Sequence, residues 1–429
     1  MQTPYSLRPY WHDEAGFSPL PEKQKWLPDQ TEILIIGGGL TGLSAALSLA
    51  RAGKKVVIVD AKQIGDGASS RNGGLLGPSF HKLGLQGLIN RFGDETATEI
   101  MRESIAGFNW LLDFINTEKI ECQLKRCGRF RGALQAKHLT AMQHQADAIT
   151  RVIDYPVSIV SKQQQHNEVG SSKYQGGIIY HADASLNPAR LVREILSRVS
   201  TAGAQIFSHT KVTGIKQTFS GFDVSVGSHV IQTQTVLVTT NGYTDDVFAE
   251  LKRRILPIRS SMIATGKLSE SRVKSVSPKL RTHGGTDRLV FYYRPSPDGR
   301  HLLFGGRALD YADKPQEYTK FLYTNMTRLF PQLKDVEISH AWSGLVAYTF
   351  DHMPHIGELN GMYYAMGYCG SGVARATYLG NKIAQKILKT GGETPFANFP
   401  FESRFMYKGT PWFMPALLRW HNFADKMGW

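Results

Sequence analysis

The chain contains 429 residues, of which 41% are hydrophobic, 20% charged and 10% aromatic, and this composition excludes a disordered tail, a collagen-like repeat and a disulfide scaffold. The formal charge is +14, but the basic residues are dispersed and form no zinc-finger, basic-zipper or RNP-type motif, which favours a basic surface attracting anionic ligands over nucleic-acid binding. The cysteines, Cys122, Cys127 and Cys369, provide neither a disulfide framework nor a four-ligand zinc site, so free thiols in a reducing compartment are favoured.

Residues 1–30 form a polar and aromatic leader. It lacks the apolar run of about 7–15 residues that defines a signal peptide. No later apolar run approaches the ~18 residues needed to span a bilayer. We therefore expect a soluble, cytoplasmic protein.

A strand–helix–strand unit follows the leader. Ile33–Ile36 is an uninterrupted aliphatic run, typical of a central parallel strand buried on both faces. After three glycines, residues 40–52 have apolar positions at helical spacing, and Gly53 ends this helix. Val56–Val59 is predicted as a second buried strand, which ends at Asp60.

The remaining predicted elements follow in chain order. Helices are expected at Thr96–Ile120, at Pro188–Val199 with Asn187 as its cap, and at Val373–Leu388. Strands are expected at Ala204–Phe207, Gly221–Val226 and Thr235–Thr239, and a hairpin joins Leu289–Arg294 to His301–Gly305. The tail has helical apolar spacing, which predicts a helix packed on the body or, alternatively, a membrane-surface or dimer contact, through Phe413, Leu417, Trp420, Ala424 and Met427.

This order predicts an α/β fold in which a Rossmann-like nucleotide-binding domain with a parallel sheet is interrupted by an antiparallel-sheet substrate domain. The cofactor domain is assigned to residues 31–90, 186–245 and 335–392. The substrate domain takes residues 91–185 and 246–334, and residues 393–429 form a tail with the amphipathic helix.

The glycine loop between the first strand and helix predicts dinucleotide binding. In the run from Gly37 to Gly42, Gly37 permits the tight turn, Gly39 lets the backbone approach a diphosphate, and Gly42 lets helix and strand pack closely. The diphosphate is expected at the helix N-terminus, where N–H groups are free. Asp60 is placed to accept hydrogen bonds from a ribose diol. A purely structural glycine turn is the alternative.

Two later segments favour FAD over NAD. The small-residue run 65–74, with Arg71, is suited to passing beside an extended dinucleotide and reaching its flavin end. The strand 236–242 ends in small residues across which a cofactor fits. A surface position for Arg71 and an ordinary core strand with an Asn-Gly turn are the alternative interpretations.

In combination, these residues resemble the D-amino-acid-oxidase-type (DAO) family of FAD-dependent oxidoreductases over nearly the whole chain. The resemblance is carried by the glycine loop, residues 67–74, Tyr292-Tyr293-Arg294 with residues 303–306, residues 340–344, residues 367–373 and the closing residues 425–429. The Ala-Ser-x-Arg-Asn-Gly-Gly loop and the closing Asp-Lys-x-Gly-aromatic resemble those of the gamma-glutamylputrescine oxidase branch.

The resemblance implies non-covalent FAD and oxidation of a carbon–nitrogen bond. An amine becomes an imine that hydrolyses to an aldehyde and a free amine, and dioxygen reoxidises the flavin to give hydrogen peroxide. The expected cofactor-binding residues are Gly37, Gly38, Gly39, Leu40, Thr41, Gly42, Asp60, Ala61, Ala68, Ser69, Arg71, Asn72, Gly73, Gly74, Val212, Thr240, Asn241, Gly242, Gly344, Gly370, Ser371, Gly372 and Val373.

The chain departs from the family at two positions. Ser371 stands where many relatives carry a histidine, and residues 302–304 lack the lysine of sarcosine-oxidase-like relatives. Backbone N–H groups at the start of the helix after Gly372 still favour negative charge on a reduced flavin. Oxidase and dehydrogenase behaviour therefore both remain open, the second with a quinone or carrier acceptor. A non-catalytic FAD-binding protein is a third hypothesis.

The substrate wall is assigned to Tyr292, Tyr293 and Arg294. An arginine pairs a carboxylate bidentately, and the tyrosines enclose an amine. Because alternate strand residues face opposite sides, only one tyrosine is expected to face the flavin. A surface or ion-pair role is the alternative for Arg294.

Three other side chains are given mainly structural interpretations. His81 is either a structural histidine or part of the active-site lining. His352 and His355 are spaced like a metal pair, but a loop role is favoured. Cys369 is close to the flavin loop in sequence, and no covalent flavin link is expected there. We expect no metal ion and no nucleic acid, and the oligomeric state stays open.

Overall fold

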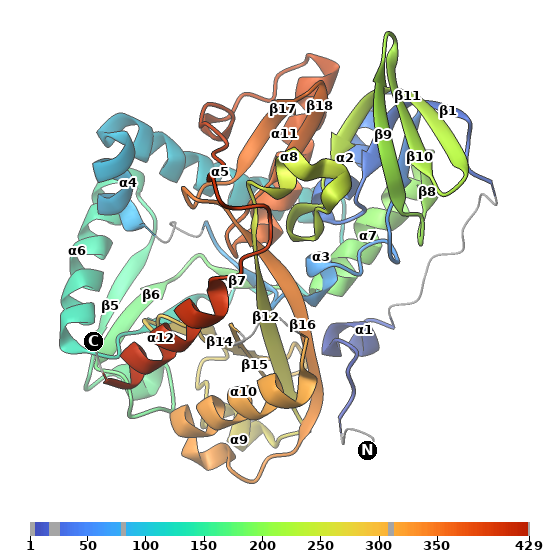
Figure 1. The fold of residues 1–429 in the computed structure, drawn as a ribbon. Helices are drawn as coiled ribbons and strands as arrows, with labels where there is room; N and C mark the ends of the chain where they lie inside the picture. Colours follow the sequence, from blue (N-terminus) through green and yellow to red (C-terminus); the bar gives the residue numbers. More distant parts are fainter. Residues whose placement is uncertain (1–4, 17–25, 79–82, 308–312, 428–429) are drawn as a thin grey trace.

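The computed structural model describes residues 5–16, 26–78, 83–307 and 313–427, and these form a mixed α/β fold built on two large sheets. Figure 1 shows the first sheet in the upper part of the molecule and the second sheet below it. Within the described residues, no helix is both long enough and apolar enough to cross a membrane.

The first sheet has a parallel centre. Its order is β17 (His355–Leu359), β18 (Met362–Met366), β11 (His229–Val238), β1 (Gln30–Ile36), β2 (Val56–Val59) and β8 (Gln205–Phe207), with β9 (Val212–Thr218) and β10 (Gly221–Val226) attached to β11. The strand β1 lies between β11 and β2 and is parallel to both. The predicted central strand is therefore confirmed.

Both faces of β1 are buried. Ile33 and Ile35 pack on one side with helices α2 (Leu40–Arg51), α5 (Asp94–Thr117), α7 (Pro188–Thr201) and α11 (Gly372–Leu388). Leu34 and Ile36 pack on the other side, with residues of β9 to β11. Apolar residues on both faces explain the uninterrupted aliphatic run. The Asn187 side chain accepts hydrogen bonds from two N–H groups of α7, as the sequence predicts.

The second sheet is mainly antiparallel. Its order is β16 (Ile338–Tyr348), β12 (Leu256–Thr265), β15 (Leu302–Arg307), β14 (Tyr292–Pro295), β13 (Thr282–Gly285), β4 (Arg129–Gly132), β6 (Gly176–Tyr180) and β5 (Val157–Ser161). The predicted hairpin is the β14–β15 pair. A short pair, β3 (Leu75–Leu76) with β7 (Ala184–Ser185), forms a third sheet.

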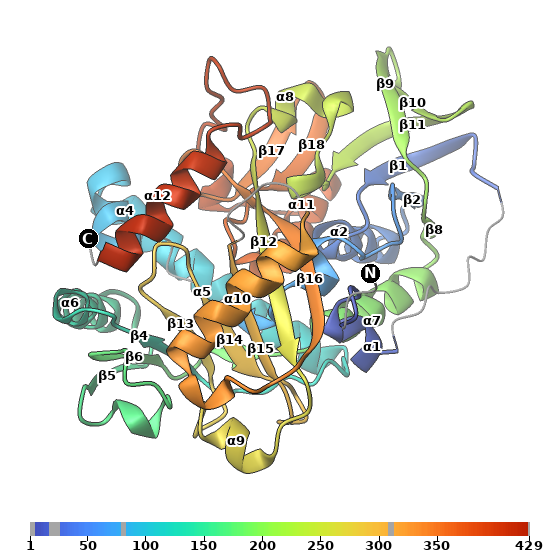
Figure 2. The ribbon, with the colours of Figure 1, turned by 60° about the horizontal axis from the view of Figure 1, so that its bottom comes forward.

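The remaining helices are α1 (Tyr10–Glu14), α3 (Ala68–Arg71), α4 (Gly84–Phe92), α6 (Ala136–Ile153), α8 (Ala249–Lys252), α9 (Glu270–Lys274), α10 (Pro315–Leu329) and α12 (Met414–Met427). Among them, α4, α6, α9 and α12 lie at the periphery of the molecule (Figures 1 and 2).

The sheet pairing corrects two predicted segment boundaries. The strand β16 falls in the segment 335–392 that was assigned to the cofactor domain, but it pairs along its length with β12 of the second sheet. The chain rejoins the first sheet only at β17. In addition, α5 was assigned to the substrate domain, yet it packs against α11 in the core of the first sheet. Both differences arise from partners distant in the sequence.

The leader is also an integral part of the fold. Trp11 of α1 is fully buried and packs with Met262, Leu303 and Trp342 of the second sheet. This segment was predicted only as a polar and aromatic leader.

The core of the second sheet contains a histidine that is expected to make folding sensitive to acid. His283 is fully buried, stacks on Tyr293 at 4.8 Å and hydrogen-bonds Ser277 through Nε2 at 2.7 Å. Burial lowers its pKa to about 3. The unfolded chain, whose histidine has an ordinary pKa near 6.5, binds a proton before the folded protein does, so stability is lost as pH falls from about 6.5 towards 3.

We expect the free energy of unfolding to fall by up to about 1.4 kcal/mol per pH unit and per proton in this range. A His283→Phe variant keeps an aromatic ring on Tyr293 and removes the titrating group. Urea unfolding at pH 7, 6 and 5 measures the difference. Stability curves that run parallel for the two proteins would contradict this role of His283.

Candidate functional site

The first glycine of the loop is fixed between two neighbouring strands. Gly37 has φ +108°, a backbone conformation that favours glycine. Its N–H donates to the carbonyl of Val59 at 2.9 Å, and its own carbonyl accepts from the Thr239 hydroxyl at 2.7 Å. The loop between β1 and α2 is therefore held from both β2 and β11.

The other glycines are required by close packing. A Cβ on Gly42 would lie 2.1 Å from the carbonyl oxygen of Gly37, and one on Gly38 would lie 2.2 Å from the Ile64 side chain. Gly39 precedes α2, and a Cβ there would lie 2.8 Å from the Ser69 hydroxyl. That hydroxyl accepts from the Leu40 N–H at 2.9 Å. These contacts bring the glycine loop together with residues 65–74, here called the Arg71 loop, at the N-terminus of α2. Backbone N–H groups there favour an anion.

Asp60 ties the end of β2 to the glycine loop. Its two carboxylate oxygens accept from the N–H groups of Gly38 at 2.8 Å and Lys62 at 2.9 Å. Burial raises the pKa of Asp60, and these two hydrogen bonds oppose the shift. Each oxygen keeps a second acceptor position, which a ribose hydroxyl suits. Ala61 follows as an exposed residue, and Val212 is buried at the start of β9.

The Arg71 loop is a single helical turn, α3, fixed by its own side chains. Arg71 donates to the carbonyl oxygen and carboxylate of Asp66, at 2.5 and 2.7 Å. The Asn72 amide donates to the carbonyls of Ala68 and Ser69, and its oxygen accepts from the Gly74 N–H. Arg71 is therefore partly buried and held in place by its pairing with Asp66.

Two buried tryptophans anchor this loop from outside. The indole N–H of Trp342 on β16 donates to the Arg71 carbonyl at 2.8 Å, and that of Trp11 on α1 donates to the Asn72 carbonyl at 2.7 Å. The second sheet and the leader thus both position the predicted cofactor loop.

The loop of residues 367–373, which precedes α11, lies on the same side of the molecule as the glycine loop. Tyr368 and Thr41 join their hydroxyls at 2.7 Å, and α2 packs directly on α11. A Cβ on Gly380 of α11 would lie 2.4 Å from the Thr41 carbonyl oxygen, so the two helices are in close contact. Ser371 occupies the N-cap of α11, followed by Gly372 and Val373 in its first turn. Both helix N-termini therefore belong to one continuous region.

The end of β11 reaches the same loop. The Asn241 side-chain oxygen accepts from the Gly367 N–H at 3.0 Å, and Asn241 itself has φ +48°. A Cβ on Gly242 would lie 3.3 Å from Leu345 of β16. Thr240 hydrogen-bonds the hydroxyl of Thr244 at 2.7 Å. The small residues at the end of β11 therefore allow close contact with residues 367–373 and with β16 of the second sheet.

One face of the second sheet points at these loops. Tyr292 lies next to Gly73, where a Cβ would be 3.0 Å from its ring, and its hydroxyl is 3.1 Å from the Ser260 hydroxyl. Gly344 adjoins the Arg71 side chain on the same face, at 3.8 Å from its Cδ to a Cβ position. Tyr293 faces the opposite way, into the apolar core, where it stacks on Phe304. Only one tyrosine of the pair faces the loops, as strand alternation predicts.

Two residues that the sequence analysis did not select complete this face. Arg307, the last residue of β15, donates to the Tyr348 hydroxyl at 2.9 Å and lies 5.1 Å from that ring's centroid. The Tyr348 hydroxyl is 3.4 Å from the Cβ position of Gly370. Arg307 is opposite Ser260 in the strand register. A signal for Arg307 follows from the hairpin register. Tyr292 pairs with Gly305 of β15, and Arg307, two residues further along that strand, lies on the same face of the sheet.

Arg294 is on the same side as Tyr292 but has a different environment. Its guanidinium is buried and donates to the carbonyls of Gly74 at 3.1 Å and Leu186 at 2.8 Å. Burial lowers its pKa to about 10. It therefore fastens the Arg71 loop to the segment before α7, a role that neither interpretation from the sequence included.

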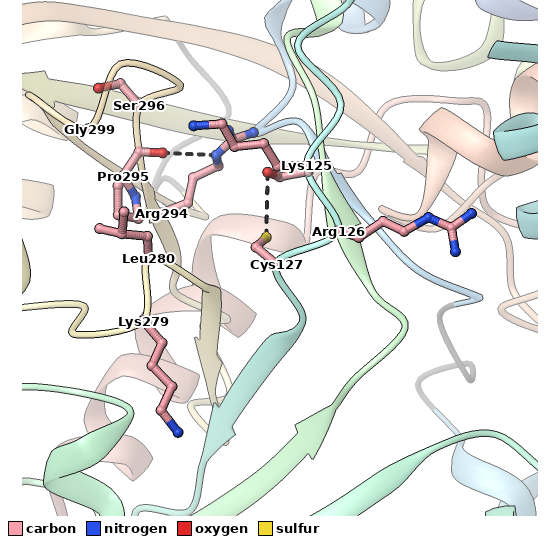
Figure 3. Close-up of a pocket in the computed structure, with 10 residues that line it drawn as sticks. Lys125, Arg126, Cys127, Lys279, Leu280, Arg294, Pro295, Ser296 and Gly299 are labelled. Atoms are coloured by element: carbon pink, nitrogen blue, oxygen red, sulfur yellow. Dashed lines mark hydrogen bonds between the residues drawn. The ribbon is translucent and has the colours of Figure 1, made fainter. Parts of the chain in front are cut away.

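A separate cavity of about 270 Å³ borders Arg294 (Figure 3). Its lining also includes Lys125, Cys127 and Ser296, and the Cys127 thiol donates to Ser185 at 3.6 Å. Tyr292, Arg307 and Tyr348 do not line it. The cluster facing the loops and this cavity are thus distinct places.

The other singled-out residues have structural surroundings. His81 lies outside the described residues. His355 is buried, hydrogen-bonds Asp351 at 3.1 Å and stacks on Phe401 at 4.3 Å. Among the described residues, no group of three or more His, Cys, Asp or Glu is placed to hold a metal ion. Cys369 is buried, which raises the pKa of its thiol to about 11.

This arrangement fits an FAD molecule. The glycine bend leaves no side chain between α2 and a diphosphate, Asp60 offers acceptors for the ribose, and the N-terminus of α11 offers N–H groups at the far end. The anchored Arg71 loop connects the two ends.

Comparison with known proteins agrees with this fit. Residues 32–386 match the profile of the DAO family, described as FAD dependent oxidoreductase. The chain is 31% identical over 373 residues to gamma-glutamylputrescine oxidoreductase of Escherichia coli K12. The aligned region covers 86% of this chain and 86% of that protein.

Solved structures show the same fold. Glycine oxidase from Geobacillus kaustophilus matches with a TM-score of 0.73 and 18% identity, over 88% of this chain and 99% of that one. L-proline dehydrogenase from P. horikoshii matches with a TM-score of 0.71 and 19% identity, over 86% and 96%. The α/β architecture with two sheets predicted from the sequence is therefore confirmed.

Proposed function

Because the chain belongs to the DAO family of FAD-dependent oxidoreductases, we propose that it oxidises a small amine that also carries a carboxylate. As a member of this family it is an enzyme that binds FAD non-covalently and acts on an amine or amino-acid substrate. The proposed substrate class is gamma-glutamylputrescine-like, and the proposed role is putrescine catabolism in the cytoplasm. The cluster of Tyr292, Arg307 and Tyr348 beside the Arg71 loop carries the substrate assignment.

Arg307 is the proposed carboxylate partner. Its guanidinium has one N–H group fixed by Tyr348, which leaves further donors in a planar fork suited to a carboxylate. The residue ends β15 and is only partly buried, so its guanidinium is accessible to a substrate. Ser260 lies opposite Arg307 on the neighbouring strand β12, and the Tyr292 hydroxyl is close to the Ser260 hydroxyl on the same sheet face.

Tyr292 is the proposed partner of the amine. Burial raises its pKa, so its phenol stays uncharged at neutral pH, and the phenol oxygen can accept a hydrogen bond from an N–H group of the uncharged amine, which leaves the nitrogen lone pair free. The uncharged amine is the reactive form, because its nitrogen lone pair assists C–H cleavage. FAD, when bound, supplies the acceptor for the hydride. The imine product hydrolyses to an aldehyde and a free amine.

The proposed electron acceptor is dioxygen, with hydrogen peroxide as product. A second function is a dehydrogenase with a quinone or carrier acceptor. It is favoured because Ser371 stands where many relatives carry a histidine, and residues 302–304 lack the lysine of sarcosine-oxidase-like relatives. The hypothesis of a non-catalytic FAD-binding protein is set aside because the matched relative is an oxidoreductase.

An anaerobic substrate panel tests the proposal. We expect gamma-glutamylputrescine and related carboxylate-bearing amines to bleach the flavin band near ~450 nm in the holoenzyme. Aerobic turnover is then followed by peroxide formation and, separately, by dye reduction. Dye reduction without peroxide selects the dehydrogenase. A flavin that stays oxidised with every amine of the panel refutes the substrate class.

A further inference from the structure

The carboxy-terminal segment carries a concentration of exposed apolar side chains. Thirteen large apolar residues are exposed in the described part of the chain, and seven of them lie between residues 405 and 427. Phe405 and Trp412 are 96% and 71% exposed. Exposed apolar side chains concentrated in one segment are typical of an interaction site. The seven, here called the tail surface, are Phe405, Met406, Trp412, Leu417, Trp420, Phe423 and Met427.

The helix α12 does not use this surface to pack on the protein. Met414 and Leu418, which are 5% and 2% exposed, attach it to the core of the second sheet. Leu417, Trp420 and Met427 follow one another at helical spacing on another face and are exposed. Figures 1 and 2 show α12 lying along the outside of the molecule. Most of the apolar stripe predicted from the sequence thus faces outward, although Ala424 is buried.

Basic residues outnumber acidic ones in this segment. Residues 404–427 contain Arg404, Lys408, Arg419 and Lys426, against Asp425 as the single acidic residue. Lys408 and Arg419 are exposed beside the tail surface, while Arg404 pairs with Glu402 at 2.8 Å. The chain as a whole has a formal charge of +14. Aromatic residues combined with basic ones are typical of helices that lie in the plane of an anionic membrane surface.

We propose that the tail surface docks this enzyme on an anionic lipid bilayer. The aromatic side chains enter the headgroup region, and Lys408 and Arg419 contact lipid phosphates. The bilayer is favoured over a protein partner because the positive charge of the segment complements anionic lipid. This inference stands independently of the substrate assignment.

Vesicle flotation of the full-length holoenzyme tests the proposal. Vesicles of phosphatidylglycerol with phosphatidylcholine are compared with vesicles of phosphatidylcholine alone. We expect binding to the anionic vesicles and a drop of about tenfold when salt is raised from about 50 mM to about 500 mM. A Trp412→Ser/Trp420→Ser/Phe423→Ser variant is expected to lose binding by about tenfold or more while keeping its activity with soluble substrate.

The matched control is Phe219→Ser. Phe219 is fully exposed between β9 and β10, outside the tail surface, and its replacement is expected to leave vesicle binding unchanged. If the triple variant does not fold, Arg419→Glu provides a second test, because it reverses one charge and leaves the apolar surface intact. Wild-type binding by both variants, or equal binding to neutral and anionic vesicles, overturns the proposal. So does a wild-type dimer in solution that the triple variant abolishes, because the surface would then be covered by a second copy.

Discussion

Replacing Gly42 by alanine is expected to produce a protein that retains little FAD. The added methyl group would lie 2.1 Å from the carbonyl oxygen of Gly37 and 2.9 Å from the Thr239 hydroxyl. Gly37 has little room to move, because Val59 and Thr239 hold it on both sides. The first turn of α2 must therefore shift away from the loop. Overpacking of this kind costs about 1–3 kcal/mol, which, if it is lost from binding, corresponds to FAD binding about 5- to 140-fold weaker.

Flavin content per chain, measured by absorbance after purification and after adding FAD, checks this expectation. Gly214→Ala is the matched control. Gly214 lies in β9 of the same sheet, has 3.6 Å to the nearest atom and needs no left-handed backbone. It is expected to retain the wild-type flavin content. Circular dichroism separates a loss of FAD from a loss of fold. A Gly42→Ala protein with full flavin occupancy would exclude diphosphate binding at this bend.

Replacing Arg307 by glutamine is expected to impair carboxylate-bearing substrates selectively. Losing a charge-assisted hydrogen bond costs about 2 kcal/mol, which corresponds to about 30-fold in kcat/KM. An amine of the same length without a carboxylate does not use this pairing, so its kcat/KM is expected to change by less than about threefold. The comparison of the two substrates makes the result specific to the carboxylate. Equal losses for both would assign Arg307 a structural role only.

Two other arginines provide controls for this experiment. Arg259 on β12 already donates to Ser343 at 2.7 Å and pairs with Asp313 at 3.3 Å, so Arg259→Gln is expected to leave the substrate preference unchanged. Arg294→Gln is expected to act on the cofactor instead, because Arg294 fastens Gly74 to Leu186. Its readout is flavin affinity. A carboxylate-selective loss in Arg294→Gln would restore Arg294 as the substrate partner.

Local sequence patterns predicted the β1–α2–β2 unit that carries the glycine loop. The β1–α2–β2 unit depends on contacts between residues close in the chain, so glycine spacing and aliphatic runs are sufficient to identify it. The same holds for the Asn187 cap and the β14–β15 hairpin. Strand alternation also predicted that only one of Tyr292 and Tyr293 faces the loops, without identifying which one.

The substrate half could not be predicted in the same way. Arg307 becomes part of the site only because β15 pairs with β12, which brings it opposite Ser260, and because Tyr348 ends the neighbouring strand β16. The burial of Trp11 depends on contacts with residues about 250 to 330 positions away. Such pairings are set by tertiary packing, and a single sequence carries no local signal for them.

The order of strands in the first sheet has a consequence for how the protein is made. Residues 33–36 of β1 pair with residues 235–238, and β11 in turn pairs with residues 363 and 364 of β18. A nascent chain leaving the ribosome therefore holds an incomplete sheet until about six-sevenths of it has been translated, and α11, which presses on α2, emerges later still. We therefore expect FAD to be captured only after this point, and chains that terminate before α11 not to be rescued by added riboflavin.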